Sequence, residues 1–499
     1  MKYLRDIRNA VFPAPELLLG MGLAQVIATL QVHASNLRLF QQMAAVAAAG
    51  FLPVPNPQVM PGLLRLETAF WGGLLFTLSV GAGLAFLSVA AAALWAGRAA
   101  QPRWAVAVPA VLQAGLLVVM NSRGFDPWVS LYFIIIPPAV FWMTRRFIRR
   151  AAHPPDGWFW VWRALPLVVL ALGWATQYDR GLFIDLRDHL LMSNAAGQRV
   201  SSFYYRYTLY PAEVFKSLDQ RQVKTVAWSD TDSRLADVRR ELIRNDYLPV
   251  DARIDADLGL RVEGDHMVFT RRGPTVLETT TSRFFSDPRG VLREISTRTD
   301  RWSPFRAFTF YGVLLAFPIG LYVLLFAGLR LAFGIVAGER RANVLCAAAC
   351  LLIGLAILAH FHFSRHSPPG PDEQATALSS PVWQARVSAL KEIRERKLDV
   401  CTYPGYTDLL RSPYPQERYW LAQALATSPS PEASTGLTRL LDDSHINVRT
   451  QALEALAQRK DRTAAGQILG HLKTSQDWYD QLYAYRALRA LGWNQALSH

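Results

Sequence analysis

Residues 71–96 read WGGLLFTLSVGAGLAFLSVAAAALWA, a stretch without a single charged side chain. An α-helix rises about 1.5 Å per residue and the hydrocarbon core of a bilayer is about 30 Å thick, so about 20 apolar residues suffice to cross it. The composition of the whole chain agrees, because 51% of its 499 residues are hydrophobic and only 18% are charged. Ordinary soluble proteins carry about 25% charged residues. The stretch 71–96 therefore predicts a transmembrane helix in an integral membrane protein.

Further apolar stretches predict a polytopic α-helical membrane protein with six or seven spans. Five more spans are clear, and they cover residues 104–120, 128–143, 158–175, 307–329 and 342–363. Tryptophan and tyrosine gather at several of their ends, as they do at membrane interfaces. The sequence thus indicates a membrane bundle over 1–175 and two further spans within 306–363.

The stretch 15–33 is a further candidate span near the N-terminus. It is less regular than the others because it contains Glu16, Gln25, Gln31 and His33. The following stretch, 39–52, is apolar but short, which favours a re-entrant or interfacial segment over a full crossing.

The net charge of +14 lies mostly beside the apolar stretches. Residues 176–305 contain 20 Lys or Arg against 19 Asp or Glu, and residues 364–499 contain 16 against 14. This distribution argues against nucleic-acid binding, which would concentrate basic residues on a soluble face. Short connections rich in arginine mark the cytoplasmic side, and the clearest follows the span 128–143, with Arg145, Arg146, Arg149 and Arg150. These signals place 176–305 and 364–499 on the non-cytoplasmic side of a plasma membrane, which is the periplasm in a Gram-negative cell.

Residues 176–305 form an insertion long enough to fold as a small α/β or α+β domain. The stretch 183–193 reads as an amphipathic helix, and 202–210 (SFYYRYTLY) alternates as a strand does. Residues 222–228 predict a second strand, and 258–271 predict a hairpin that turns at Gly264-Asp265.

Two groups of polar residues are candidate sites. Asp185, Asp188 and His189 lie close together in the inserted domain and are weak candidates for catalysis, because a solvated helix face with neighbouring charges is the simpler explanation for them. His362 and His366 share a helix face if the last span continues, so they are candidate metal ligands. A metal site needs converging groups, and we expect neither a metal nor any other cofactor.

Four stretches of the C-terminal part recur at intervals of 31 or 32 residues. They are ARVSALKEI (385–393), ERYWLAQAL (417–425), VRTQALEAL (448–456) and DQLYAYRAL (480–488). Leucines between them, at 410, 441 and 472, recur every 31 residues. Helix pairs at a fixed period bury their apolar faces by stacking, so residues 375–499 predict an all-α solenoid, joined to the last span by the proline-rich linker 364–374.

The unit LLDDSHINVRTQALEAL (440–456) resembles a HEAT repeat of the short kind also found in phycobilisome-lyase-like proteins. In such folds the aspartate and arginine usually bond to the backbone or to each other between repeats. The resemblance therefore implies structural roles for Arg386, Arg418, Asp442 and Arg449.

A solenoid offers an extended surface for protein partners. Aromatic side chains are candidate contacts, namely Tyr406, Tyr414, Trp478 and Tyr479, although packing within the fold is the alternative for the tryptophan. The sequence favours a membrane scaffold whose repeats and inserted domain dock partner proteins. The alternatives are a subunit associated with a transporter or permease and, less favoured, a membrane enzyme acting on envelope or lipid-linked substrates. The sequence leaves the oligomeric state and the partner open.

Overall fold

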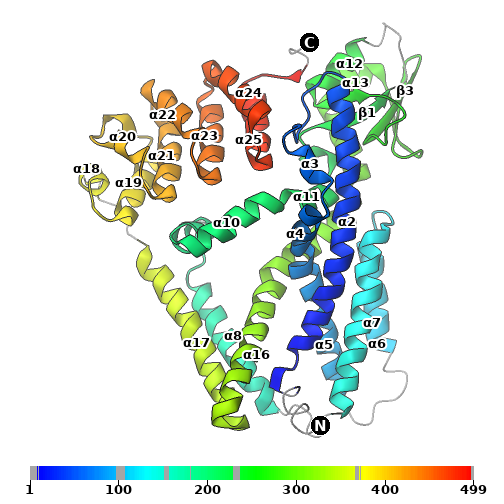
Figure 1. The fold of residues 1–499 in the computed structure, drawn as a ribbon. Coiled ribbons are helices and arrows are strands. Elements are labelled where there is room, and N and C mark those ends of the chain that lie inside the picture. The colour runs from blue at the N-terminus through cyan, green and yellow to red at the C-terminus, as the bar shows by residue number, and fades with distance from the viewer. Residues whose placement is uncertain are drawn as a thin grey trace.

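A computed structural model describes residues 8, 10–96, 107–150, 157–179, 181–228, 236–365, 370 and 373–495. The described chain is mostly helical, with long helices in one half of the molecule and a solenoid and a small sheet in the other (Figure 1). His366 and most of the predicted linker 364–374 lie outside these residues.

The longest helix, α2 (Ala14–Ala48), runs from near the N-terminus to the sheet at the far end of the molecule (Figure 1). It joins the candidate span 15–33 to most of the stretch 39–52 without a break, so the prediction of a separate short segment there is wrong. Burial explains the continuity, because Ala24, Ala28, Val32, Leu39 and Val46 form one buried stripe at helical spacing.

Within the ranges that the structure describes, five helical stretches are long and apolar enough to cross a membrane, and they are Ala14–Ala48, Leu66–Trp95, Pro127–Arg149, Ser303–Ile335 and Arg341–Ser364. Two apolar helices are shorter, Ala107–Met120 and Val161–Ala175. The second long stretch consists of α4 (Leu66–Phe76), a π-helical turn, η1 (Thr77–Gly81), and α5 (Ala82–Ala96). The short helix α3 (Met60–Leu63) precedes α4 at the end near the solenoid (Figure 1). The remaining helices of the half with the long helices are α6 (Ala107–Met120), α7 (Pro127–Arg150), α8 (Gly157–Ala175), α15 (Ser303–Tyr311), η6 (Gly312–Ala316), α16 (Phe317–Ala337) and α17 (Glu339–Ser364).

The sheet has the order β2-β1-β3-β4-β5 and is mixed. Its strands are β1 (Lys224–Trp228), β2 (Tyr247–Val250), β3 (Leu258–Glu263), β4 (His266–Thr270) and β5 (Thr275–Thr280). β1 is parallel to both neighbours, whereas β3, β4 and β5 are antiparallel. The helices α12 (Ala236–Arg244), α13 (Thr281–Ser286) and α14 (Pro288–Thr299) share its apolar core. The predicted strand 222–228 and the hairpin at Gly264-Asp265 are therefore confirmed.

The predicted strand 202–210 is wrong, because these residues are helical. They belong to α10 (Ala195–Tyr207) and α11 (Leu209–Phe215). The Asn194 side chain caps the first of them by accepting a hydrogen bond from the Gly197 amide, at 2.8 Å. Alternating tyrosines suit a strand by propensity, but here tertiary packing decides, as it often does for β-prone residues. The predicted helix 183–193 is present as α9 (Leu182–Leu186) and η3 (Arg187–Leu191).

The solenoid stacks four helix pairs beside α10 (Figure 1). The first helices of the pairs are α18 (Gln374–Leu378), α20 (Tyr406–Leu409), α22 (Glu432–Leu440) and α24 (Ala465–Thr474). The second helices are α19 (Trp383–Glu395), α21 (Pro415–Thr427), α23 (Ile446–Arg459) and α25 (Trp478–Ala490). One continuous apolar core includes residues of the long helices, of α11 and of all four pairs, so the solenoid is packed onto the rest of the chain.

Candidate functional site

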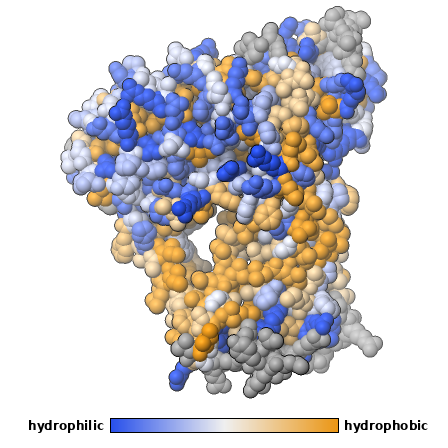
Figure 2. Space-filling view, viewed as in Figure 1, coloured by the Kyte–Doolittle hydropathy of each residue, from blue (hydrophilic) through white to orange (hydrophobic). Residues whose placement is uncertain are grey.

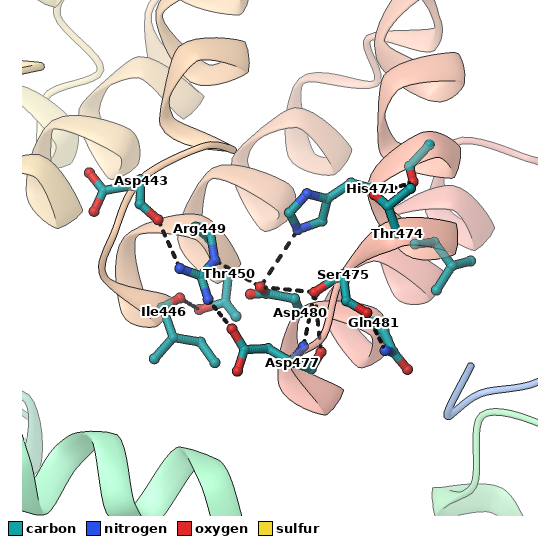
Figure 3. Close-up of polar contacts among 12 residues, drawn as sticks. Asp443, Ile446, Arg449, Thr450, His471, Thr474, Ser475, Asp477, Asp480 and Gln481 are labelled. Carbon is teal, nitrogen blue, oxygen red and sulfur yellow. Dashed lines mark hydrogen bonds and ion pairs between the residues drawn. The ribbon is translucent and has the colours of Figure 1, made fainter. Parts of the chain in front are cut away.

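An arginine at the start of the second helix of each of the first three repeats ties that repeat to the next one. We call Arg386, Arg418 and Arg449 the arginine ladder. Arg386 Nε donates to Glu417 Oε1 at 2.8 Å, and Arg449 Nε donates to Asp480 Oδ2 at 2.7 Å. Figure 3 shows Arg449 between the two repeats, with Asp477 and Asp480 on one side and the Asp443 carbonyl on the other. These contacts join consecutive repeats, and on that ground we propose a structural role for the three arginines.

The carboxylate that faces Arg418 belongs to Asp443. Its Oδ1 accepts a hydrogen bond from Arg418 Nη2 at 2.9 Å, whereas Asp442 beside it is exposed. The sequence assigns this contact to Asp442, but in the structure Asp443 forms it. The two aspartates are adjacent in the sequence, and only the course of the turn before α23 decides which of them points inward.

Each ladder residue also closes the turn six residues before it. Arg449 Nη1 donates to the Asp443 carbonyl at 2.8 Å, and Arg386 and Arg418 do the same to the carbonyls of Ser380 and Ser412. In the last repeat Gln481 takes this place, and its Nε2 donates to the Ser475 carbonyl at 2.8 Å (Figure 3). Glutamine closes the turn but carries no charge with which to form an ion pair to a further repeat, so the arginine ladder ends at this repeat.

The solenoid contacts the rest of the chain at the starts of its second helices, again at an interval of 31 residues. Gln416 Nε2 donates to the Asp188 carbonyl at 3.1 Å, Asn447 accepts from the Tyr205 hydroxyl, and the Trp478 ring lies 5.1 Å from that of Tyr210. One face of the solenoid is thereby docked on the segment from η3 to α11.

Asp185, Asp188 and His189 lie together at the point where α17, η3 and the first two repeats meet. Asp185 accepts hydrogen bonds from Arg365 Nε at 2.8 Å and from Lys391 Nζ at 2.9 Å. Asp188 is fully buried and accepts from Arg187 and from Trp420 Nε1, the latter at 2.7 Å. We call this group the junction cluster.

The electrostatics of the junction cluster follow from burial and pairing. Burial alone would raise the pKa of Asp185, but the hydrogen bonds and charges of Lys391 and Arg365 outweigh it, and the pKa is lowered. Burial lowers the pKa of His189, whose ring packs between those of Phe361 and Trp383. Asp185 is thus ionised and matched by Lys391 and Arg365. Asp188 pairs with Arg187 and Trp420, and together these contacts hold the surrounding elements in place.

The predicted partner contacts divide into two groups. Trp478 and Tyr479 face the chain itself, since Tyr479 packs 4.9 Å from the Tyr205 ring and shares a hydrogen bond with Thr208. Tyr406 is half-buried within its repeat, while Tyr414 is 39% exposed and stacks on Trp383 at 6.1 Å. Of the four, Tyr414 is the one that presents a broad surface to solvent.

A row of tyrosine, glutamine and arginine side chains crosses the second helices where they pass α10. Gln423 Nε2 donates to the Tyr419 hydroxyl at 2.9 Å and to Gln451 Oε1 at 3.2 Å. Arg187 lies 3.8 Å from the Tyr419 ring centre and Arg486 lies 5.7 Å from that of Tyr483. We call this surface the tyrosine face, and it consists of Tyr204, Tyr419, Gln423, Glu454, Tyr483 and Arg486. Sequence analysis missed it, because its members come from four helices and only the stacking of the repeats aligns them.

The histidine pair considered as metal ligands is not brought together within the described residues. His362 Nδ1 lies 3.1 Å from Gln177 Oε1, and His366 lies outside the described part of the chain. Among the residues that the structure describes, no group of three or more His, Cys, Asp or Glu side chains converges as metal ligands do.

His445 makes the stability of the solenoid depend on pH. Burial lowers its pKa to about 4, since neither ring nitrogen has a hydrogen-bond partner and Arg418 and Arg449 are close. The folded state then binds the proton less well than the unfolded state. The contribution of His445 to the free energy of unfolding is therefore complete above about pH 6.5 and is lost as the pH falls towards 4.

Between pH 8 and 5 we expect the solenoid to lose about 2 kcal/mol of stability, measured as a lower melting temperature of the full chain in detergent. In the His445→Gln variant this part of the pH dependence should vanish, and a variant with the same pH profile as the wild type would refute the assignment.

Comparison with known proteins identifies the type of repeat in the solenoid. Residues 404–489 match the family model of HEAT repeats. No curated protein and no solved structure matches the chain. The repeats recognised in the sequence are thereby confirmed, and the C-terminal part of the chain is a solenoid of HEAT-like repeats.

Proposed function

We propose that the chain is an integral membrane protein that acts as a scaffold, and that its HEAT-like solenoid binds a protein partner through the tyrosine face. The observation that carries the proposal is the match of residues 404–489 to HEAT repeats, a class of solenoid whose extended surfaces bind other proteins. Tyrosine and arginine are the residue types enriched at the centres of such interfaces.

Membrane embedding is supported by the surface of the long helices. Figure 2 shows apolar residues over the half of the molecule that these helices form, and hydrophilic residues over the half with the solenoid and the sheet. Large side chains such as Leu112, Val118, Leu172 and Leu352 are more than 60% exposed there. A soluble protein rarely exposes an apolar surface of this extent, so a bilayer is its natural solvent.

The solenoid and the sheet lie at the same end of the long helices (Figure 1). Tyr485 and Arg489 of α25 both bond to Asp246 beside the sheet, with distances of 2.6 and 3.1 Å to its carboxylate. Arg145, Arg146 and Arg149 lie on the last turns of α7, at the other end of the bundle. This arrangement supports an orientation with both modules outside the cytoplasm, which is periplasmic in a Gram-negative inner membrane.

The alternatives find less support in the described residues. A transporter role calls for a continuous polar path, but the buried polar residues Glu16 and Gln31 of α2 are separated by buried glycine, alanine and isoleucine. An enzyme that used the acids of the junction cluster would need a carboxylate free to act, and there both carboxylates already hold arginine, lysine or tryptophan donors of the same chain. We propose a positioning role for that cluster instead.

Substitutions in the tyrosine face should weaken binding of the partner protein. We expect the double variant Tyr204→Ala/Arg486→Glu to weaken partner binding about thirtyfold or more, because central aromatic and arginine side chains carry most of an interface's binding energy. Both side chains are exposed, so the fold should be retained. The measurement is quantitative recovery of co-purified proteins with the tagged full chain in mild detergent, followed by titration of the recovered partner.

The matched control changes exposed residues on the opposite helices of the repeats, in Arg439→Glu/Lys473→Ala. A partner that is retained by the wild type and the control but lost from the face variant supports the proposal. If the same proteins accompany all three forms in equal amounts, the tyrosine face is not the binding surface.

A further inference from the structure

Three groups of elements form a closed frame around an opening in the apolar half of the molecule. They are an arm of α8 and α17, the bundle that includes α16, and the helix α10. α8 and α17 pack together as an arm that meets α16 at the base of the molecule (Figure 1). There the Tyr322 hydroxyl of α16 donates to the Arg163 carbonyl of α8 at 2.7 Å. At its other end the arm is held by the junction cluster, where Arg365 bonds to Asp185 of α9 and Phe361 of α17 packs against His189 of η3.

The helix α10 closes the frame as a crossbar. It leads from η3 at the end of the arm to α4 in the bundle, where the Phe203 ring lies 5.7 Å from that of Trp71. Figure 2 shows an opening through the molecule directly beneath α10, with apolar residues below it and hydrophilic residues above it. The helices that border it carry many exposed apolar side chains, which include Leu165, Val168 and Leu172 of α8, Leu352 and Leu355 of α17, and Phe310 and Leu315 of α15 and η6.

The two faces of α10 differ in chemistry. Ser201 and Tyr205 point to the solenoid, where both contact Asn447. On the opposite side Val200 and Phe203 are exposed apolar residues. Arg199 and Arg206 lie four residues before and three residues after Phe203, so all three share one side of the helix, and both arginines are exposed. A helix with an apolar stripe flanked by arginine is typical of membrane interfaces.

The closed frame limits what can occupy the opening. A membrane-spanning helix of a partner needs about 30 Å of uninterrupted height, but the crossbar blocks one end of the opening and the meeting point of α8 and α16 blocks the other. The acyl chains of one leaflet extend over only half of the hydrocarbon core, and they can enter from the side. A phosphate headgroup above them would reach the level of α10, where the arginines supply the complementary charge.

We propose that the opening binds a phospholipid of the leaflet next to α10, with its acyl chains between the arm and the bundle and its phosphate beside Arg199 and Arg206. The proposal rests on the proposed membrane embedding. The bound lipid fills the space between the arm and the bundle and thereby supports the crossbar on which the solenoid is docked.

The test uses the full chain, extracted in mild detergent and exposed to phosphatidylglycerol, with bound lipid counted by native mass spectrometry. We expect Arg199→Glu/Arg206→Glu to reduce lipid retention about tenfold, because two attractive charges become repulsive. The matched control, Arg239→Glu/Arg240→Glu, makes the same change of charge on the exposed side of α12 and should retain lipid as the wild type does. A phosphatidylglycerol with a photoreactive acyl chain should label peptides of α8, α10 and α17.

The possible outcomes distinguish failure of the lipid site from failure of the proposed membrane embedding. Equal retention in both double variants, or labelling confined to outward-facing helices such as α6, overturns the lipid site while the chain remains a membrane protein. If alkaline carbonate releases the chain from membranes and no peptide is labelled, the proposed embedding fails, and the lipid site fails with it. Loss of lipid in the α10 variant alone, together with labelled α10 peptides, supports the site.

Discussion

Replacing Arg418 with leucine should destabilise the solenoid more than any other single change in the ladder. Its guanidinium bonds to both carboxylate oxygens of Asp443 and to the Ser412 carbonyl. The side chains of the pair are only 10% and 6% exposed, so the substitution leaves a buried carboxylate without a counter-charge. Removing one partner of a buried ion pair costs about 3–5 kcal/mol.

Hydrogen exchange of the full chain in detergent measures this effect. Amides of α21 and α23 should exchange about a hundredfold faster or more, because each 1.4 kcal/mol changes an equilibrium constant tenfold. Arg439→Leu on the exposed side of α22 is the control, and it should change exchange by less than about threefold. Equal protection in Arg418→Leu and the control would show that the ladder does not stabilise the stack.

Replacing Asp188 with leucine should detach the first two repeats from the rest of the chain. The change removes the charge that balances Arg187 and the acceptor of the Trp420 indole N–H. The indole N–H then remains without an acceptor and Arg187 without a counter-charge in a buried place, a loss of about 3 kcal/mol or more. Asp188→Asn, which still accepts a hydrogen bond but carries no charge, should give an intermediate effect.

Distances between spin labels report this detachment. A label at Thr407 on α20 and another at Glu278 on β5 should give one narrow distribution in the wild type and a broad one in Asp188→Leu, in a background with Cys401→Ser. A label at Gln467 on α24 supplies the internal control, because the last repeat stays bound through Asp246 and Arg489. An unchanged Thr407 distribution would mean that the junction cluster does not hold the repeats.

The sequence predicts best the features that depend on local periodicity. The spacing of Arg386, Arg418 and Arg449 identifies the repeats because each repeat makes the same contacts with the next, so the same residue recurs. The long apolar helices follow in the same way from composition over about 20 residues. The strand prediction for 202–210 fails because aromatic residues serve strands and packed helices equally well, and the solenoid face that receives Tyr205 lies more than 200 residues away.

The candidate site was only partly accessible from the sequence for a related reason. The sequence singles out Asp185, Asp188 and His189 as weak catalytic candidates, but their partners Arg365, Lys391 and Trp420 follow far along the chain. Clustered acidic residues suggest a catalytic site when their basic partners cannot be recognised in the sequence. Once those partners are known, the same residues indicate a structural role. Glu417 likewise gives no signal, because nothing in its own repeat marks it as the partner of Arg386.

The proposed scaffold function requires the solenoid and the sheet to lie on the outer side of a membrane that the long helices cross. Single cysteines at Asp265 on the β3–β4 turn and at Glu432 on α22, both exposed, can be tested with a maleimide that does not cross membranes. A third cysteine at Arg146, near the end of α7, serves as the inner reference. We predict that spheroplasts label the first two positions and that the third reacts only after lysis. Labelling of Arg146→Cys in intact spheroplasts, with Asp265→Cys and Glu432→Cys protected until lysis, would contradict the account.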